Sequence, residues 1–470
     1  MREIAFAEVP LEPYRDALGE ERLESLRRGC ERVRSLLGGR TVWNVNSTAA
    51  GGGVAELLHV LGPLARAAGV DVRWLVLDGD AEFQAIAKRL VSRLYGVAGD
   101  GGPLGDAEAR RYRRRIEESA EPLAAFLRPG DVVIVHDPQP AGLIGTARRC
   151  GASVVWRCHI GSDQANEHTR DGGRFVGGFV AEADATVFST IGHVAGWAPR
   201  PLVIPPSIDP CGPKNMPLTG AQVRDVLGVA GLIAHERPAP VETPVPVGAG
   251  VRVHRPAVVL REGPPPPADL PMVVQVSRWD RLKDMIGVLE SFVASGVDGY
   301  LTLAGADLAG VADDPAAAGV YDECRQVWES LPGGHRRRCQ LVCLPMDDLR
   351  ENAVMVNALQ RHASVVVQKS LAEGFGLTAT EAMWKSRPLV ASAVGGLRDQ
   401  VTDGETGLLV GDPRDVATTA AHLRRLFRDR PFARRLGEGA RRRVRERYLP
   451  DRQLLDWARL IEGVTTKEAA

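Results

Sequence analysis

Short apolar runs rich in β-branched residues alternate with helical patterns along most of the chain. The runs of the first half lie at 41–45, 73–77, 131–136, 153–159 and 185–190, and those of the second half lie at 272–277, 300–305, 339–345, 363–370 and 388–394. Strands separated by helical segments favour βαβ units and parallel sheets. Uninterrupted apolar runs indicate strands covered by helices on both faces. The sequence therefore predicts an α/β fold with two doubly wound, Rossmann-like domains and an interdomain cleft.

A proline-rich stretch at 236–271 separates the two sets of strands and is typical of an extended connector. We place an N-terminal Rossmann-like domain at 1–262, a proline-rich linker at 263–271 and a C-terminal Rossmann-like domain at 272–447. The last segment, 448–470, is amphipathic and predicts a helix that packs back across the junction. A chain of 470 residues suits two or three domains of ~150 residues each.

The charge balance argues against nucleic-acid and membrane partners. Acidic and basic residues number 59 each, so no overall field attracts a polyanion. No apolar run approaches the ~20 residues of a transmembrane helix, and the N-terminus is too acidic for a signal peptide. Seven scattered cysteines without a CxxC pattern indicate a reducing compartment. We expect a cytoplasmic protein; the sequence leaves its oligomeric state open, a homodimer included.

The segment SLAEGFGLTATEAMWKSRP, 370–388, joins a predicted strand to a predicted helix. Its glycines let the backbone approach a ligand closely, and N–H groups at a helix start favour a phosphate. Glu373 lies at the carboxyl end of the strand, where a carboxylate can accept hydrogen bonds from sugar hydroxyls. Thr378 and Glu381, which lie three residues apart after the loop 371–377, also match a capping box, in which Glu381 would be structural. Both interpretations of Glu381 stay open here.

The first strand of each predicted domain is followed by residues that could bind a ligand: cations in the second half and glycines in the first half. Arg278 and Lys283 come after the strand at 272–277, and paired cations suit a diphosphate, although they could also be ordinary surface residues. In the first half, a strand leads into the glycine triplet 51–53 and then into a helix. Such a loop brings backbone amides toward a phosphate or sugar, or forms a tight turn.

Polar side chains also end two further strands of the first half. His136 ends the run at 131–136 and Asp137 directly follows it. Arg157 and His159 alternate along the next run, so their two side chains share one face of that strand. Polar groups on an apolar strand are costly unless they meet a ligand or each other. These four residues are therefore candidate ligand-binding groups, with a packed, hydrogen-bonded histidine as the alternative for His136.

The spacing Glu-x7-Glu in EGFGLTATE resembles the signature of retaining GT-B glycosyltransferases of the large fourth family, which use nucleotide-sugars. The segment GGLRDQVTDGETGLLV, 395–410, follows at that family's spacing. The blocks NSTAAGGGVAELL, VHDPQP, WRCHI, IPPSIDP and ENAVMVNALQR are similar to one subgroup, the trehalose glycosyltransferring synthases. This resemblance covers most of the chain from Val42 to Val410.

The resemblance implies a role for each matching residue. Glu373 would hold the donor sugar, Glu381 the ribose, and Arg278 with Lys283 the diphosphate. The implied donor-binding residues are Gly51, Gly52, Gly53, Arg278, Lys283, Glu373, Gly374, Phe375, Gly376, Leu377 and Glu381. The expected catalytic residues are His136, Arg278, Lys283 and Glu373, and the expected acceptor-binding residues are Asp137, Arg157 and His159.

The implied reaction is retaining transfer of glucose from UDP- or ADP-glucose to free glucose, which forms α,α-trehalose. Alternatives are another sugar, sugar phosphate or polyol as acceptor, a trehalose phosphorylase, and a sugar-nucleotide sensor without turnover. We expect no tightly bound cofactor and no resident metal, with Mg²⁺ as a stimulant at most. The chain departs from the subgroup at Gly161, at Val91-Ser92 and over 222–266, so the donor is better supported than the acceptor.

Overall fold

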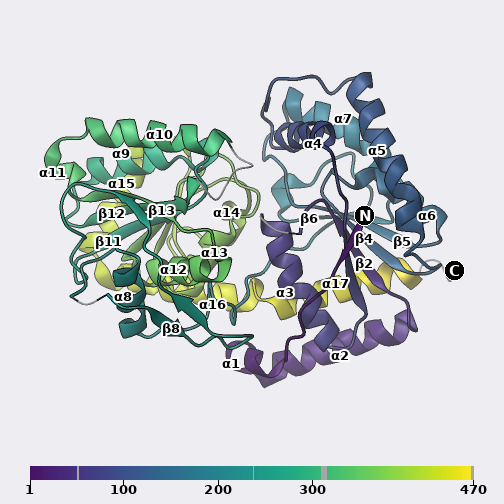
Figure 1. Cartoon of the computed structure of the whole chain (residues 1–470), viewed down its shortest axis with the longest axis horizontal. Coiled ribbons are helices and arrows are strands. Elements are labelled where there is room, and N and C mark those ends of the chain that lie inside the picture. Colours follow the sequence, from purple (N-terminus) through teal and green to yellow (C-terminus); the bar gives the residue numbers. More distant parts are fainter. Residues whose placement is uncertain (50–51, 237, 309–314, 467–470) are drawn as a thin grey trace. The chain divides into compact units, whose positions relative to one another are not determined.

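The computed structural model describes residues 1–49, 52–236, 238–308 and 315–466 (Figure 1). The chain forms two compact units: unit 1 contains Met1–Ser207 and the segment from Tyr448 onward, and unit 2 contains Ile208–Arg447. In the described residues each unit holds one seven-stranded, largely parallel sheet with helices on both faces. The predicted class, an α/β protein with two doubly wound domains, is confirmed.

The sheet of unit 1 has the order β1-β3-β2-β4-β5-β6-β7, and the edge strand β1 is antiparallel to β3. Its central strands carry no exposed residue, as the uninterrupted apolar runs predicted. The strands are β1 (Arg2–Ile4), β2 (Val42–Asn46), β3 (Val72–Val76), β4 (Val132–His136), β5 (Ser153–Cys158), β6 (Ala185–Phe188) and β7 (Pro201–Val203).

Two groups of helices cover the sheet of unit 1. Helices α2, α3 and α17 lie on one face, and α4 to α7 lie on the other (Figure 1). Burial of each large apolar side chain between these layers stabilises the unit by about 1.5–3 kcal/mol. The helices are α1 (Arg15–Leu18), α2 (Glu20–Leu37), α3 (Gly53–Ala67), α4 (Ala81–Leu94), α5 (Asp106–Ala124), α6 (Ile144–Arg149), α7 (Glu167–Val180) and α17 (Pro450–Thr465).

The sheet of unit 2 has the order β10-β13-β12-β11-β14-β15-β16, and β10 is its antiparallel edge strand. A separate hairpin pairs β8 with β9. The strands are β8 (Val241–Thr243), β9 (Val251–Val253), β10 (Val258–Leu260), β11 (Met272–Val276), β12 (Tyr300–Ala306), β13 (Cys339–Leu344), β14 (Val365–Gln368), β15 (Leu389–Ser392) and β16 (Leu408–Val410).

Helices α9, α10 and α15 cover one face of this sheet, and α8, α12 and α13 cover the other (Figure 1). Acidic N-caps begin several of them: Asp348 accepts from the N–H groups of the first turn of α12, and Asp415 does so for α15. The helices are α8 (Gly220–Val229), α9 (Met285–Ser295), α10 (Pro315–Ser330), α11 (Gly333–Arg336), α12 (Leu349–His362), α13 (Leu377–Trp384), α14 (Gly395–Gln400), α15 (Val416–Arg428) and α16 (Arg430–Arg447).

Both sheets reverse their strand order at one place. In unit 2 the reversal lies between β11 and β14, and in unit 1 it lies between β2 and β4. In open α/β sheets, ligands bind outside the carboxyl ends of the strands at such a switch point. These two positions are therefore where candidate site residues have to be examined.

The boundary between the units differs from the prediction. Segment 208–262 belongs to unit 2, because it supplies partners that unit 2 needs. The fully buried Asn357 of α12 donates to the carbonyls of Pro213 and Met216, each at 2.9 Å, and β10 adds an edge strand beside β13. The proline-rich composition indicated extended chain, but it could not show which sheet that chain joins. The predicted linker 263–271 also lies inside unit 2.

The last helix, α17, belongs to unit 1 and contacts α2 and α3. The approach to α2 is close, since a Cβ at Gly29 would lie 2.4 Å from the Leu455 Cδ2 atom. None of the described helices is long and apolar enough to cross a membrane.

Candidate functional site

An ion pair spans the switch point of unit 2. Lys283 ends a short 3-10 helix (Arg281–Lys283) after β11, and Glu373 lies in the loop after the neighbouring strand β14. The Lys283 Nζ atom donates to Glu373 Oε2 at 2.6 Å, and the Ser370 hydroxyl donates to the same oxygen at 3.0 Å. Both charged side chains are only partly accessible, 14% and 12%. The structure therefore brings together two of the predicted catalytic residues.

Arg278 is placed differently from its predicted partner. Its side chain is 68% exposed and donates to Asp280 Oδ2 at 2.9 Å. Among the described ion pairs, Glu373 contacts Lys283 and not Arg278. Arg278 and Lys283 thus contact different carboxylates in this structure. That both bind the donor diphosphate stays a prediction for the donor complex.

Helix α13 begins earlier than a capping box would require. Its N-cap is Gly376, at φ 89°, and its first residue is Leu377, so Thr378 already lies inside the first turn. The structural interpretation of Thr378 and Glu381 as a cap is therefore wrong. As at any helix start, the first N–H groups of α13 have no acceptor inside the helix. They come one residue after the segment Glu373, Gly374 and Phe375.

Glu381 lies on α13 in a buried and charged environment. It is 4% exposed, and its Oε1 atom is 3.5 Å from Lys214 Nζ. The neighbouring Lys385 ammonium donates to the Asn215 and Gln360 side-chain oxygens and to the Glu381 carbonyl. Burial holds the pKa of Lys385 well below its usual value, and the Glu381 charge offsets part of that shift. Sequence reasoning missed both lysines, because Lys214 lies in the segment that was assigned to the other domain.

Two glycines of α14 lie against the loop that carries Glu373. A Cβ at Gly395, which has φ 47°, would lie 1.8 Å from the Glu373 carbonyl oxygen. A Cβ at Gly396 would lie 2.5 Å from the Phe375 carbonyl oxygen, and the Gly396 N–H donates to the Gly374 carbonyl. These residues shape the loop backbone. Their signal was present in the sequence as the block that follows EGFGLTATE.

A second buried cation fixes the residue after Lys283. Lys369, which is 1% exposed, donates to Asp284 and to the Pro413 carbonyl. Asp284 has φ 48° and caps α9 by accepting from the Gly287 N–H. A left-handed backbone is uncommon outside glycine, although aspartate adopts it more readily than most residues. The two polar contacts of Asp284 hold the turn on which Lys283 lies. No sequence motif indicated this role for Lys369.

In unit 1, two predicted histidines meet at the switch point. His136 ends β4, and its Nδ1 atom lies 3.0 Å from His159 Nε2, while its Nε2 atom lies 3.0 Å from Asn44 Oδ1 on β2. An acceptor at Asn44 makes His136 Nε2 the donor, so Nδ1 accepts from His159. Burial lowers the pKa of His136 to about 3, which keeps the imidazole neutral at neutral pH. Both nitrogens of His136 are thus engaged by protein groups.

Asp137 turns the chain directly after His136. Its backbone is left-handed, at φ 64°, and its Oδ1 atom accepts from the His159 N–H at 2.7 Å. Burial raises the pKa of the carboxyl to about 7, while the His159 N–H and the Arg157 charge act in the opposite direction. The predicted acceptor residues Asp137 and His159 therefore lie together.

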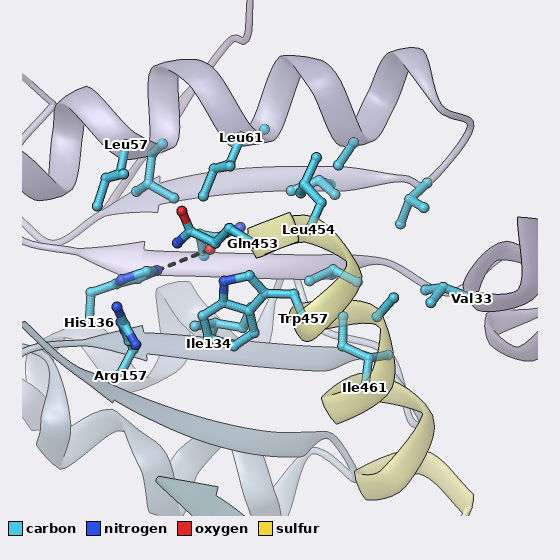
Figure 2. Close-up of a pocket in the computed structure, with 18 of the residues that line it drawn as sticks. Val33, Leu57, Leu61, Ile134, His136, Arg157, Gln453, Leu454, Trp457 and Ile461 are labelled. Atoms are coloured by element: carbon cyan, nitrogen blue, oxygen red, sulfur yellow. Dashed lines mark hydrogen bonds between the residues drawn. The ribbon is translucent and has the colours of Figure 1, made fainter. Parts of the chain in front are cut away.

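Arg157 of β5 lines one cavity of unit 1 (Figure 2). His159, which directly follows β5, lines the same cavity, so the two residues lie on one side of the strand as predicted. Arg157 is completely buried: its guanidinium donates to the Phe188 carbonyl at 2.9 Å and to Ser189 Oγ at 3.2 Å. Burial lowers its pKa to about 9, and the Asp137 charge opposes that shift. Arg157 faces an apolar cavity, a setting that the sequence did not predict.

Two predicted glycines of unit 1 lie at the start of α3. Gly52, at φ 83°, is the N-cap of α3, and Gly53 is its first residue, whereas Gly51 lies outside the described residues. The departure at Gly161 has a steric cause, because a Cβ there would lie 2.5 Å from the Cβ and Cγ atoms of the buried His193.

Two solved structures share this fold over nearly their whole length. Sucrose-phosphate synthase from Thermosynechococcus elongatus matches with a TM-score of 0.63 and 20% identity, over 91% of this chain and all of that chain. An E. coli trehalose-6-phosphate structure bound with UDP-2-fluoro glucose matches with a TM-score of 0.63 and 14% identity, over 90% and 99%. A family model described as glycosyl transferases group 1 matches residues 350–443. The fold and this match define a glycosyltransferase of the GT-B class.

Whole-chain relatives narrow the assignment. The trehalose synthase of Pyrococcus horikoshii is 31% identical over 458 residues, which are 96% of this chain and 95% of that protein. The trehalose synthase of Rubrobacter xylanophilus is 32% identical over 462 residues, 96% of each. A model of the trehalose synthase N-terminal domain matches residues 44–195. The chain belongs to the trehalose synthase family.

More distant relatives include a trehalose phosphorylase of Pleurotus pulmonarius, which is 26% identical over 466 residues. The match spans 92% of this chain but only 58% of that protein.

Proposed function

We propose that the enzyme transfers glucose from a nucleotide-glucose, UDP- or ADP-glucose, to free glucose with retention of configuration, and so forms α,α-trehalose. The observation that carries the donor half is the Lys283–Glu373 ion pair at the switch point of unit 2, beside the first turn of α13. A cation, a carboxylate and helix N–H groups suit a diphosphate next to a hydroxylated sugar.

Each group has a separate task in this proposal. Glu373 accepts hydrogen bonds from the donor sugar, and its present contact with Lys283 holds the carboxylate in place. Lys283 and the N–H groups of α13 stabilise the charge that grows on the departing diphosphate. Arg278, exposed on the same segment, turns from Asp280 to the diphosphate as a second cation.

The proposed displacement takes place on one face of the sugar. The departing phosphate oxygen accepts the proton of the acceptor hydroxyl as the new glycosidic bond forms. A covalent route would need a carboxylate nucleophile beneath the anomeric carbon. Asp137 is already held by the His159 N–H, which suits a positioning role in unit 1 better than a nucleophilic one.

The acceptor half of the proposal depends on the family and on the polar cluster of unit 1. Relatives named trehalose synthases cover 96% of the chain, which supports glucose as the acceptor. His136, His159 and Asp137 form one hydrogen-bonded group at the switch point of unit 1. We assign this group to positioning the acceptor.

A second candidate is phosphorolysis of trehalose. The Pleurotus pulmonarius relative supports it, because the match with a trehalose phosphorylase extends over 92% of this chain. An anion site of the kind formed at Lys283 and α13 could also take inorganic phosphate. The two reactions differ in whether a nucleotide is required.

A donor-by-acceptor grid tests the proposal. UDP- and ADP-glucose are each incubated with glucose, glucose 6-phosphate, glycerol or no acceptor, with Mg²⁺ or with EDTA. We expect glucose to give the fastest nucleotide release and α,α-trehalose as the product. In a parallel reaction, trehalose is incubated with phosphate and without nucleotide. Faster release with another acceptor would overturn the acceptor assignment, and nucleotide-independent formation of glucose 1-phosphate would establish phosphorolysis instead.

A further inference from the structure

Lys214 lies in a loop of unit 2 whose backbone is held by α12. The fully buried Asn357 donates to the carbonyls on either side, those of Pro213 and Met216, at 2.9 Å each. Arg361, one turn further along α12, also donates to the Met216 carbonyl, at 2.9 Å. The backbone around Lys214 is therefore fixed, while its side chain is 27% exposed.

The Lys214 ammonium faces the carboxylate of Glu381 on α13. Its Nζ atom lies 3.5 Å from Glu381 Oε1, and the Glu381 side chain is buried. The attraction between opposite charges grows as water is excluded from around them. A carboxylate that is removed from water is costly unless a cation accompanies it. Lys214 supplies such a cation.

Lys385, on the same helix as Glu381, directs its hydrogen bonds to other groups. An ammonium has three N–H donors. Lys385 donates to Asn215 Oδ1 at 2.9 Å, to Gln360 Oε1 at 2.7 Å and to the Glu381 backbone carbonyl at 3.2 Å. These three bonds use its donors on groups other than the Glu381 carboxylate. Lys214 is therefore the lysine whose ammonium is placed to orient that carboxylate.

The backbone that carries Glu381 is fixed at the start of α13. Gln360 donates to the Thr378 carbonyl at 3.2 Å, and Gln400 donates to the Phe375 carbonyl. What these bonds leave open is the direction of the long Glu381 side chain. A binding group has to be held close to its productive geometry by its neighbours, and the ion pair with Lys214 does this for the carboxylate.

We propose that Lys214 is a positioning residue for the donor: it keeps the Glu381 carboxylate ionised and directed at the ribose hydroxyls of the nucleotide. This inference rests on the proposed function, in which Glu381 holds the ribose. An ionised carboxylate only accepts hydrogen bonds, whereas the neutral acid also carries a donor. Two hydroxyls that both donate therefore need the ionised form. Lys214 thus determines how strongly the enzyme prefers a ribonucleotide over a nucleotide without these hydroxyls.

The test is a calorimetric titration of the full chain with UDP and with 2′,3′-dideoxy-UDP, and with the same pair of adenine nucleotides. Hydrogen bonds to a charged acceptor are strong enough to expect the wild type to prefer the ribonucleotide by about tenfold or more. Lys214→Met should remove most of this preference, because the ribonucleotide binds more weakly and the dideoxynucleotide binds as before. Lys214→Gln repeats the test if Lys214→Met does not fold.

Two further variants act as controls. Lys214→Arg keeps the positive charge, and we expect it to keep most of the preference. Arg252→Met is the matched control, because Arg252 forms an ion pair of similar length with Glu242, 3.8 Å, on an exposed hairpin of the same unit. Its side chain is 62% exposed. The Arg252→Met protein should discriminate between the two nucleotides as the wild type does.

A double variant shows whether Lys214 acts through Glu381. If it does, Lys214→Met combined with Glu381→Gln should bind the ribonucleotide as weakly as Glu381→Gln alone, since residues in one network are not additive. Additive losses would mean that Lys214 acts on the nucleotide independently of Glu381, and they would overturn the inference.

The remaining outcomes are also decisive. Equal losses for both nucleotides in a folded Lys214→Met protein would show a general structural role, and an unchanged preference would show no role. A loss in Lys214→Arg as large as that in Lys214→Met would show that the charge is not what matters. Each result would overturn this inference alone, because the titrations contain no acceptor and measure no turnover. A wild type that bound neither UDP nor ADP would overturn the proposed donor as well.

Discussion

Lys283 donates to Glu373 at 2.6 Å although 90 residues separate them in the chain. The contact exists because β11 and β14 are neighbours at the switch point of unit 2, so the loops after both strands meet. The pair is partly shielded from water, and Lys369 and Ser370 hold the segments on either side of it. Turnover should therefore fall sharply when one of these two charges is removed, and it should change little when a neighbouring surface charge is removed.

Lys283→Ala should lower turnover by about two powers of ten or more, which is the scale of a lost transition-state charge partner. Nucleotide release with saturating donor and glucose measures this. Arg281→Ala is the control, because Arg281 lies in the same short helix with 69% exposure and pairs with Glu323 on the surface. Equal rates for the two variants would remove Lys283 from the catalytic group.

Arg278→Ala tests whether an exposed cation moves to the donor. Its surface pair with Asp280 contributes only about 0–1 kcal/mol to stability, so the free energy of unfolding should hardly change. If Arg278 turns to the diphosphate, turnover should still fall by roughly a hundredfold. A rate close to that of the wild type would show that Lys283 acts without it.

Glu381→Gln and Thr378→Ala test the roles of these two residues of the EGFGLTATE segment, the first in donor binding and the second in the stability of α13. Because α13 starts at Leu377, Thr378→Ala should not cost the about 0.5–2 kcal/mol of a lost N-cap. Glu381→Gln should weaken donor binding clearly, measured by titration with the nucleotide-sugar, because the carboxylate is proposed to hold the ribose. Unchanged donor affinity in Glu381→Gln would leave that residue with a purely structural role beside Lys385.

Gly395→Ala should disrupt the loop that carries Glu373. Its Cβ would meet the Glu373 carbonyl at 1.8 Å, so the loop has to move away. Gly404→Ala is the matched control: it also has positive φ, 75°, but nothing lies within 4 Å of its Cβ. We expect both to lose about 1 kcal/mol or more of stability from backbone strain, and only Gly395→Ala to lose donor binding. Similar donor affinities would show that the loop adapts.

Asp137→Asn should change how stability depends on pH. The folded-state pKa of about 7 is above the unfolded value of about 3.9. The folded state therefore binds the extra proton between these values, and the contribution of Asp137 to stability falls as pH rises through that range. Asparagine tolerates the left-handed backbone and keeps an acceptor for the His159 N–H.

The unfolding midpoint of the Asp137→Asn variant, compared with that of the wild type at pH 5, 6, 7 and 8, measures this effect. The difference in favour of the variant should grow with pH up to about 7 and then level off, because His136 and His159 are present in both proteins and cancel. A constant difference would mean that the Asp137 carboxyl titrates as it does in the unfolded chain.

The sequence alone determined the central strands of both sheets and the class of fold, but not the edge strands such as β1, β7, β10 and β16. All ten predicted strands are present. A strand whose residues are apolar on both faces is stable only where helices cover both faces of the sheet, so these runs form the buried strands. It also placed Lys283 and Glu373 at strand ends, since a strand and the loop after it are local features of the chain. The family resemblance that EGFGLTATE carries is likewise a property of adjacent residues.

Tertiary structure decided everything that depends on which distant segments meet. Segment 208–262 completes unit 2 because Asn357 and β13 need partners, a requirement that no local pattern reveals. The cap at Thr378 was lost because Gly376 takes the left-handed turn earlier in the chain. Arg157 became a completely buried cation beside an apolar cavity, because Trp457, about three hundred residues later, packs over it. Local propensity sets what each segment can form, whereas burial and hydrogen bonding between remote segments set what each side chain faces.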